Sequence, residues 1–196
     1  MDDLRRQLLE EIKQNAINFG DFVLSSGKTS HYYLDCRKVT LSAKGAYLTG
    51  NAMFEALHPY DVQAVGGMTV AADPIATAIA VESWHRSHPL RAFIVRKEAK
   101  GHGMQRQVEG PVRAGDRVAI VDDVLTTGGS ILQAIESVEA IGLSVATVAV
   151  ILDRLEGGAE KIAERGYSVI SLFTLDDIRE FLDAHRPATH PAAPTV

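Results

Sequence analysis

The chain contains very little cysteine. Cys36 is the one cysteine among 196 residues, which excludes an internal disulfide framework and fits a reducing compartment. Long apolar runs are also missing, since no stretch approaches the roughly 18 residues that a membrane span requires. The amino-terminal residues, MDDLRRQLLEEIKQ, lack the apolar core of a secretory signal peptide. We therefore expect a cytoplasmic protein with no membrane partner.

An excess of positive charge is absent as well. The formal net charge is −5, whereas a nucleic-acid-binding protein is expected to present a broad basic face. The composition therefore argues against a nucleic-acid partner. The length suggests a single domain, because domains commonly comprise about 100–200 residues.

We expect this domain to span residues 1–185, with about residues 1–40 forming a small amino-terminal hood over the ligand. The tail of residues 186–196 places three prolines among alanines, a composition that predicts disorder.

Strand and helix patterns alternate along most of the chain. This order predicts an α/β fold with a parallel, doubly wound (Rossmann-like) sheet. Gly20 is positioned to end the first helix. The predicted strands cover residues 22–24, 31–35, 62–65, 90–95, 118–121, 144–152 and 169–173, and the predicted helices cover residues 3–18, 42–57, 75–84, 131–141, 158–165 and 175–185.

One stretch, VAIVDDVLTTGGSI at residues 118–131, combines several features of a ligand site. Four apolar residues predict a buried strand, and Asp122 and Asp123 follow where that strand should leave the core. Ligands of open α/β sheets bind beyond the carboxyl ends of the strands. A glycine-rich turn that enters a helix suits a phosphate, and paired acids suit hydroxyl groups. A ribose that carries a 5-phosphate satisfies both requirements.

Other proteins share parts of this pattern. Paired aspartates at a strand end also occur in receiver-like and metal-dependent phosphatase folds, and a Gly-Gly pair is an ordinary turn. A nucleotide-hydrolysing P-loop is disfavoured, because the Gly-Lys-Ser/Thr ending is missing.

A second polar stretch, RKEAKGHGMQRQVEG, covers residues 96–110. Its composition alone is typical of a solvated mobile loop. However, it begins directly after a predicted strand, hence at the ligand-binding edge, and its glycines would allow a lid to close. Cations brought over a departing pyrophosphate would stabilise its developing charge.

Residues 118–131 resemble the phosphoribosyl-pyrophosphate (PRPP) signature of type I phosphoribosyltransferases, in which a strand precedes the motif and a helix follows it. Three further stretches, RKEAKGHG, FVLSSGKTSHYYLD and ILDR, resemble orotate phosphoribosyltransferases. This similarity extends over roughly residues 19–154. The RKEAKGHG loop is the more specific signal, because purine and other phosphoribosyltransferases share the PRPP motif.

Carried over residue by residue, the resemblance implies that Lys100 and His102 are catalytic and bind the pyrophosphate of PRPP together with Arg96. Lys97 would do so from the neighbouring subunit of a homodimer. Orotate would be bound by Thr126 and Arg154, and a guanidinium is suited to this role because it pairs bidentately with a carboxylate. The remaining PRPP-binding positions would be Asp122, Asp123, Val124, Leu125, Thr126, Thr127, Gly128, Gly129 and Ser130.

The chain departs from the family pattern at two places. Ser25 stands where many members have a lysine, and the loop of residues 69–73 lacks a second lysine. One or two of the family's PRPP contacts are therefore missing, and the basic loop would carry more of the pyrophosphate binding. Gly66 and Gly67, expected to follow the strand at residues 62–65, would permit close contact through main-chain N–H groups. Tyr32 and Tyr33 either frame the base or pack within a strand.

The resemblance implies a magnesium-dependent pentosyl transfer in which orotate and PRPP give orotidine 5′-monophosphate and pyrophosphate, a step in pyrimidine (UMP) biosynthesis. Mg²⁺ would bind mainly substrate oxygens and keep several waters. No direct protein ligand is expected, and Asp122 and Asp123 would touch it through water. Two alternatives remain open: a purine or other phosphoribosyltransferase, and a transcription regulator that senses PRPP without catalysis.

Overall fold

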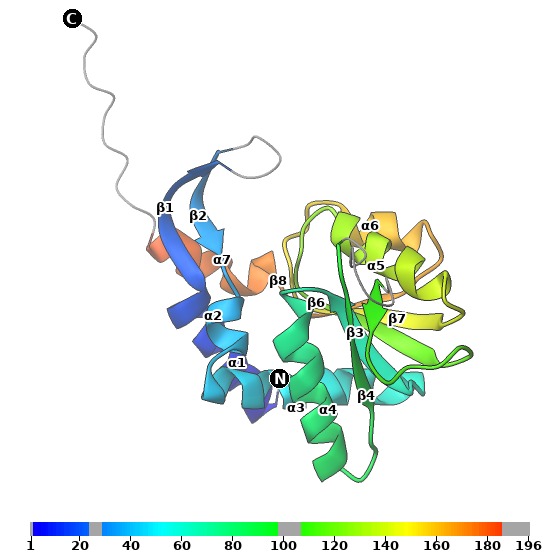
Figure 1. The fold of residues 1–196 in the computed structure, drawn as a ribbon. Coiled ribbons are helices and arrows are strands. Elements are labelled where there is room, and N and C mark those ends of the chain that lie inside the picture. Colours follow the sequence, from blue (N-terminus) through cyan, green and yellow to red (C-terminus); the bar gives the residue numbers. More distant parts are fainter. Residues whose placement is uncertain (1, 24–28, 98–106, 186–196) are drawn as a thin grey trace, which may run out of the picture.

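The computed structural model describes residues 2–23, 29–97 and 107–185 of the chain. Its centre is a six-stranded sheet in the order β5-β4-β3-β6-β7-β8 (Figure 1). Neighbouring strands are parallel, except that the edge strand β5 runs antiparallel to β4. This confirms the predicted fold class. The strands are β3 Ala64–Met68, β4 Arg91–Val95, β5 Val108–Glu109, β6 Arg117–Leu125, β7 Ser144–Asp153 and β8 Val169–Thr174.

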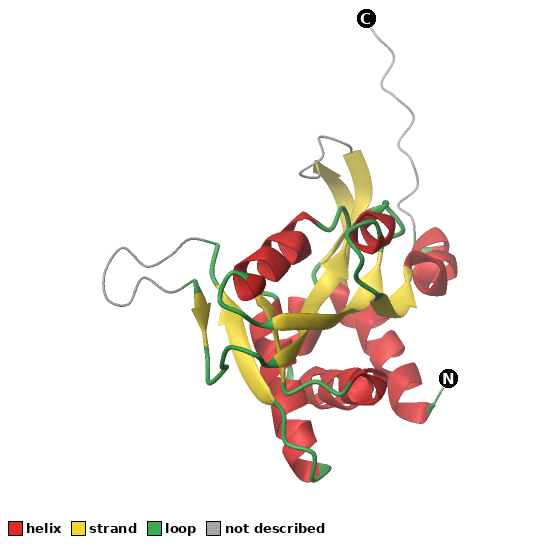
Figure 2. Cartoon of the chain, turned by 90° about the vertical axis from the view of Figure 1, so that its right-hand side faces the viewer, coloured by secondary structure: helices red, strands yellow, loops and turns green. Residues whose placement is uncertain are grey.

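Helices cover both faces of this sheet (Figure 2). Alternate residues of β6 separate the two cores: Ala119 and Val121 pack with α1, α3, α4 and α7, whereas Val118 and Ile120 pack with α5 and α6. Because both faces are buried, β6 and β7 read as continuous apolar runs. The helices are α1 Asp3–Glu11, α2 Arg37–Thr40, α3 Ala43–Leu57, α4 Ala72–His85, α5 Gly129–Glu139, α6 Gly158–Ala163 and α7 Leu175–Ala184. In the described ranges, no helix is both long and apolar enough to cross a membrane.

The amino-terminal hood is a separate two-stranded antiparallel sheet of β1 (Ile17–Val23) and β2 (Thr29–Leu34). In Figure 1 this hairpin stands apart from the main sheet. The predicted helix of residues 3–18 ends earlier, at Ala16, after a π-helical turn η1 (Ile12–Ala16). Gly20 does not end that helix. It lies inside β1 with φ +154°, where the pairing register with β2 shifts, because strand pairing takes over from Ile17 onward.

A second correction concerns Gly66 and Gly67. We expected them after the strand, but both are buried inside β3. A Cβ atom on Gly66 would lie 2.2 Å from the carbonyl oxygen of Phe93, and one on Gly67 would lie 2.1 Å from that of Val121. These glycines therefore allow β3 to pack closely within the sheet, and they do not form a ligand loop. The short elements α2, β5 and the 3-10 turn η2 (His58–Tyr60) were not predicted.

Candidate active site

A cavity of about 700 Å³ opens at the edge of the sheet where β3, β4, β6 and β7 end. Parallel strands bring their carboxyl ends to one edge, so segments far apart in the sequence meet here. The lining residues come from five segments: Tyr33, Leu34, Asp35 and Arg37 of the hood; Met68 at the end of β3 with Thr69, Val70 and Ala71 after it; Lys97 after β4; residues 122–131; and Arg154 and Glu156 after β7.

The turn after β6 forms the floor of the cavity. β6 continues to Leu125, so the two acids belong to its last residues and do not follow it. Gly128 caps α5 with φ +75°, a left-handed conformation that favours glycine. The described turn therefore presents the amino terminus of α5 to the cavity, an arrangement suited to a phosphate.

Asp122 and Asp123 are held by short-range hydrogen bonds. Asp122 Oδ1 accepts from the N–H of Asp123 at 2.9 Å, and Asp122 Oδ2 accepts from Ser130 Oγ at 3.3 Å. Asp123 Oδ1 accepts from the N–H of Val124 at 2.7 Å. Burial, followed by the charge of Asp123, raises the pKa of Asp122 to about 7. Burial also raises the pKa of Asp123. An incoming hydroxyl or cation would thus meet acids that are poorly solvated.

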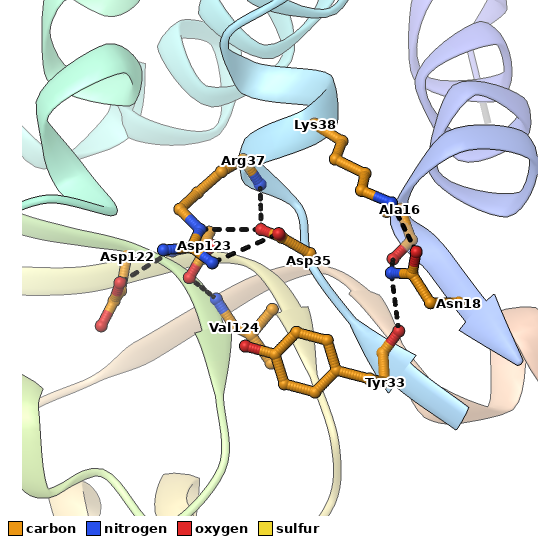
Figure 3. A network of polar contacts seen from close by, with 9 residues as sticks. All are labelled: Ala16, Asn18, Tyr33, Asp35, Arg37, Lys38, Asp122, Asp123 and Val124. Carbon is orange, nitrogen blue, oxygen red and sulfur yellow. Dashed lines mark hydrogen bonds and ion pairs between the residues drawn. The ribbon is translucent and has the colours of Figure 1, made fainter. Parts of the chain in front are cut away.

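The hood contributes an ion pair beside these acids, which the sequence did not single out. The Arg37 side chain donates to Asp35 from Nε at 2.7 Å and from Nη2 at 3.2 Å. Figure 3 shows this pair next to Asp123, and the charge of Arg37 lowers the pKa of Asp123 against the effect of burial. The one available signal was the Asp-Cys-Arg sequence at the end of a predicted strand.

Arg154 reaches the cavity from the end of β7. Its side chain is 9% exposed, and its Nε lies 2.8 Å from Glu156 Oε1. The guanidinium carbon lies 5.4 Å from the ring centroid of Tyr32. A buried guanidinium with an open side toward the cavity suits a planar carboxylate.

The structure therefore brings together Asp122 to Ser130, Lys97 and Arg154 around one cavity. Arg96 is not among the described lining residues, because its Nη1 pairs with Glu109 Oε1 at 2.8 Å. Lys100 and His102, predicted to be catalytic, lie outside the described residues. So does Ser25.

The loop of residues 69–73 contributes polar groups in place of the missing lysine. Thr69 Oγ1 donates to Asp73 Oδ2 at 2.6 Å, and the Thr69–Val70 peptide bond is cis. Tyr33 lines the cavity, while Tyr32 contacts it through Arg154. The sequence did not point to Glu156 either. Only the short distance between its carboxylate and the Arg154 guanidinium in the structure identifies it.

No group of three or more His, Cys, Asp or Glu residues within the described part of the chain could hold a metal ion. Asp122 and Asp123 are the adjacent carboxylates of the cavity. Two hard oxygen donors suit a cation that keeps most of its water and takes its other ligands from a substrate.

Comparison with known proteins adds independent findings. Residues 64–181 match the family described as "Phosphoribosyl transferase domain". The chain is 45% identical over 177 residues to the orotate phosphoribosyltransferase of Aquifex aeolicus (89% of this chain, 97% of that protein). It is 48% identical over 180 residues to that of Rhodopirellula baltica (89% and 92%).

Solved structures agree. Orotate phosphoribosyltransferase of Mycobacterium tuberculosis in complex with PRPP is similar at a TM-score of 0.73 and 33% identity, over 91% of this chain and 93% of that chain. A phosphoribosyltransferase of Corynebacterium diphtheriae reaches a TM-score of 0.81 at 35% identity (91% and 99%).

Proposed function

Because this chain belongs to the orotate phosphoribosyltransferase family, we propose that it transfers the ribose 5-phosphate of PRPP to orotate. The products are orotidine 5′-monophosphate and pyrophosphate, and the step belongs to pyrimidine (UMP) biosynthesis. The observation that carries this proposal is that one cavity is lined both by the β6 turn, which suits a ribose phosphate, and by the buried side chain of Arg154.

On the floor, the N–H groups of Thr126 to Gly129 and the hydroxyl of Ser130 would hold the 5-phosphate at the start of α5. Asp122 and Asp123 would accept from the ribose hydroxyls. Both acids are buried, so hydroxyl donors would replace hydration that the fold has removed. The cavity thereby fixes the anomeric carbon relative to the base.

At the end of the neighbouring strand β7, Arg154 would pair with the carboxylate of orotate, and Thr126 would contact the ring. A ring nitrogen of orotate forms the new bond to the anomeric carbon. The bond from that carbon to the pyrophosphate oxygen breaks, and pyrophosphate leaves with its electron pair. Positioning, charge stabilisation and exclusion of water then account for catalysis.

The basic loop would stabilise the departing pyrophosphate through Lys100 and His102. Arg96 would join them once it leaves Glu109, with which it forms an ion pair. Closure of such a loop excludes water and completes the catalytic arrangement.

Mg²⁺ would neutralise charge on the pyrophosphate and orient the ribose hydroxyls when bound. Asp122 and Asp123 would hold it through water or through the substrate, as suits a cation that keeps most of its water. The buried free thiol of Cys36 fits a reducing cytoplasm, where we place the enzyme.

We further propose a homodimer. Tyr47 of α3 and Val81 and Trp84 of α4 are more than half exposed, at 59%, 55% and 73%. The two helices pack against each other, and exposed apolar side chains on neighbouring helices are candidates for an interface. Lys97 lies beside the cavity of its own chain, and in the dimer we expect its side chain to serve the partner's site instead.

Subunit mixing tests the shared site. A Lys97→Ala chain is combined, under conditions that exchange subunits, with a chain that carries Asp122→Asn and Asp123→Asn. If Lys97 serves the partner, each mixed dimer contains one complete site and shows about half of the wild-type activity, although both parent dimers are inactive. No recovery on mixing would mean that Lys97 acts within its own chain.

The transfer itself is tested by the loss of orotate absorbance on adding PRPP and Mg²⁺. Hypoxanthine, adenine and uracil serve as control bases. Consumption of orotate alone supports the proposal, whereas turnover of a purine would assign the chain to another phosphoribosyltransferase. PRPP binding without any turnover would favour the alternative of a transcription regulator that senses PRPP without catalysis.

A further inference from the structure

The guanidinium of Arg154 is a buried charge that needs compensation. Removing the partner of a buried ion is strongly destabilising, because it leaves an uncompensated charge. The described residues offer it one carboxylate, Glu156 Oε1, at 2.8 Å from Nε. They also offer one aromatic face, that of Tyr32 at 5.4 Å. The arginine is therefore held from two different parts of the chain, the β7–α6 turn and the hood.

The turn that brings Glu156 back onto Arg154 is built into the backbone. Asp153 Oδ1 accepts from the N–H of Leu155 at 2.8 Å. Leu155 then adopts φ +58°, a left-handed conformation unusual for a leucine. Gly157 follows with φ +86°. These successive bends reverse the chain, so the carboxylate of Glu156 faces the residue two positions before it.

The chain beyond the turn is fixed as well. A Cβ atom on Gly158 would lie 2.5 Å from the carbonyl oxygen of Thr126, so α6 starts in close contact with the cavity floor. The N–H of Arg154 donates to the carbonyl oxygen of Leu125 at 2.9 Å. The backbone on either side of the turn is thus tied to the β6 segment that carries the acid pair.

The orientation of the three groups leaves one edge of the guanidinium open. Glu156 lies at the Nε edge, but this contact is ionic, because Nε has no hydrogen-bond partner in the described part of the chain. Tyr32 lies near the guanidinium, at a distance typical of a cation–π contact. No described residue accepts a hydrogen bond from either Nη atom of Arg154. That edge remains for a ligand in the cavity.

We propose that Glu156 and Tyr32 are positioning residues for Arg154, which together hold its two Nη groups ready for the carboxylate of the base. The inference rests on the proposed function and names the residues that set its base specificity. Glu156 compensates the buried charge of Arg154 and fixes the rotation of the guanidinium. Tyr32 restricts movement of the guanidinium out of its plane. A base with a carboxylate then meets a prearranged partner, and less ordering is needed on binding.

The test compares Glu156→Ala and Glu156→Gln with the matched control Glu164→Ala, which alters an exposed residue at the far end of α6. Steady-state kinetics are measured for both substrates, together with thermal unfolding. We expect Glu156→Ala to raise the KM for orotate about tenfold, the scale of one misplaced charge-assisted contact. The kcat and the KM for PRPP should stay within about twofold of the wild-type values, well below the expected change in the orotate KM. Glu156→Gln should raise the orotate KM less, because its amide oxygen can still face Nε.

Two variants of Tyr32 test the second half of the proposal. Tyr32→Leu removes the aromatic face and should raise the orotate KM, and Tyr32→Phe, which keeps the ring, should raise it less. An unchanged or lowered orotate KM in Glu156→Ala would overturn the inference, since Glu156 would then be neutral or a competitor of the substrate. Equal changes in both KM values with a lowered melting temperature would also overturn it and would indicate a purely structural role. If the wild-type enzyme does not consume orotate, the proposed function itself fails, whatever the variants show.

Discussion

Replacement of Asp122 by asparagine should stabilise the ligand-free protein at neutral and alkaline pH. The carboxyl group is 6% exposed, and burial together with Asp123 raises its pKa from 3.8 to about 7. In the unfolded chain the same group ionises near its ordinary value. Between these two pH values the folded protein holds a proton that the unfolded chain has lost, so the contribution of this group to stability falls as pH rises.

The magnitude follows from the two pKa values. At about 1.4 kcal/mol per pKa unit, the difference corresponds to a cost of about 4 kcal/mol above pH 7. This is an upper limit, because water and small movements relax a buried charge. Asparagine is neutral at all these pH values and keeps an oxygen for the N–H of Asp123. We therefore expect a gain of about 1–4 kcal/mol at pH 8 that shrinks toward zero near pH 4.

Urea unfolding from pH 4 to pH 8, without PRPP or Mg²⁺, measures this difference. Asp116→Asn is a control whose effect should stay constant over this range: the hydrogen bond from Arg91 lowers the pKa of Asp116 below its ordinary value of 3.8, so its stabilising effect is present throughout and disappears only below about pH 4. The two variants should diverge as pH rises. A loss of stability in Asp122→Asn at pH 8, or a difference that does not change with pH, would refute the reasoning.

Three further changes test other parts of the account. The double change of Asp122 and Asp123 to asparagine should abolish or strongly weaken PRPP binding, measured by calorimetry. Cooperative unfolding should be retained. Full activity would show that these acids do not belong to the site. Gly67→Ala should destabilise the fold by about 3 kcal/mol or more, because its Cβ would lie 2.1 Å from the carbonyl oxygen of Val121; an unchanged melting temperature would contradict the close packing of β3. Trp84→Lys should convert the proposed dimer into a monomer in sedimentation, and a dimer that persists would exclude this face as the interface.

Much of the sheet could be predicted from local pattern. The apolar run of residues 118–121 is buried on both faces, so its composition alone indicates a central strand. The acid pair and the glycine turn are contiguous in the sequence, and their position at the carboxyl end of a strand places them at the ligand edge. The floor of the site was therefore predictable because the residues that form it are neighbours in the chain.

Features that depend on distant contacts were not predictable in this way. Gly66 and Gly67 look like a turn, and only the neighbouring strands at Phe93 and Val121 show that they are packing residues. Gly20 resembles a helix end, but pairing of β1 with β2 decides its conformation. The contact between Arg154 and Tyr32 joins residues far apart in the sequence. Spacing alone carries no signal for it.

The central claim is that one cavity binds PRPP at the β6 turn and orotate at Arg154. Arg154→Lys tests it most directly, because lysine keeps the charge but loses the planar fork. Orotate and PRPP affinities of the wild-type and variant proteins are measured separately. The account predicts a loss of about 1–3 kcal/mol for orotate with little change for PRPP. Equal losses for the two ligands, or none for orotate, would contradict it.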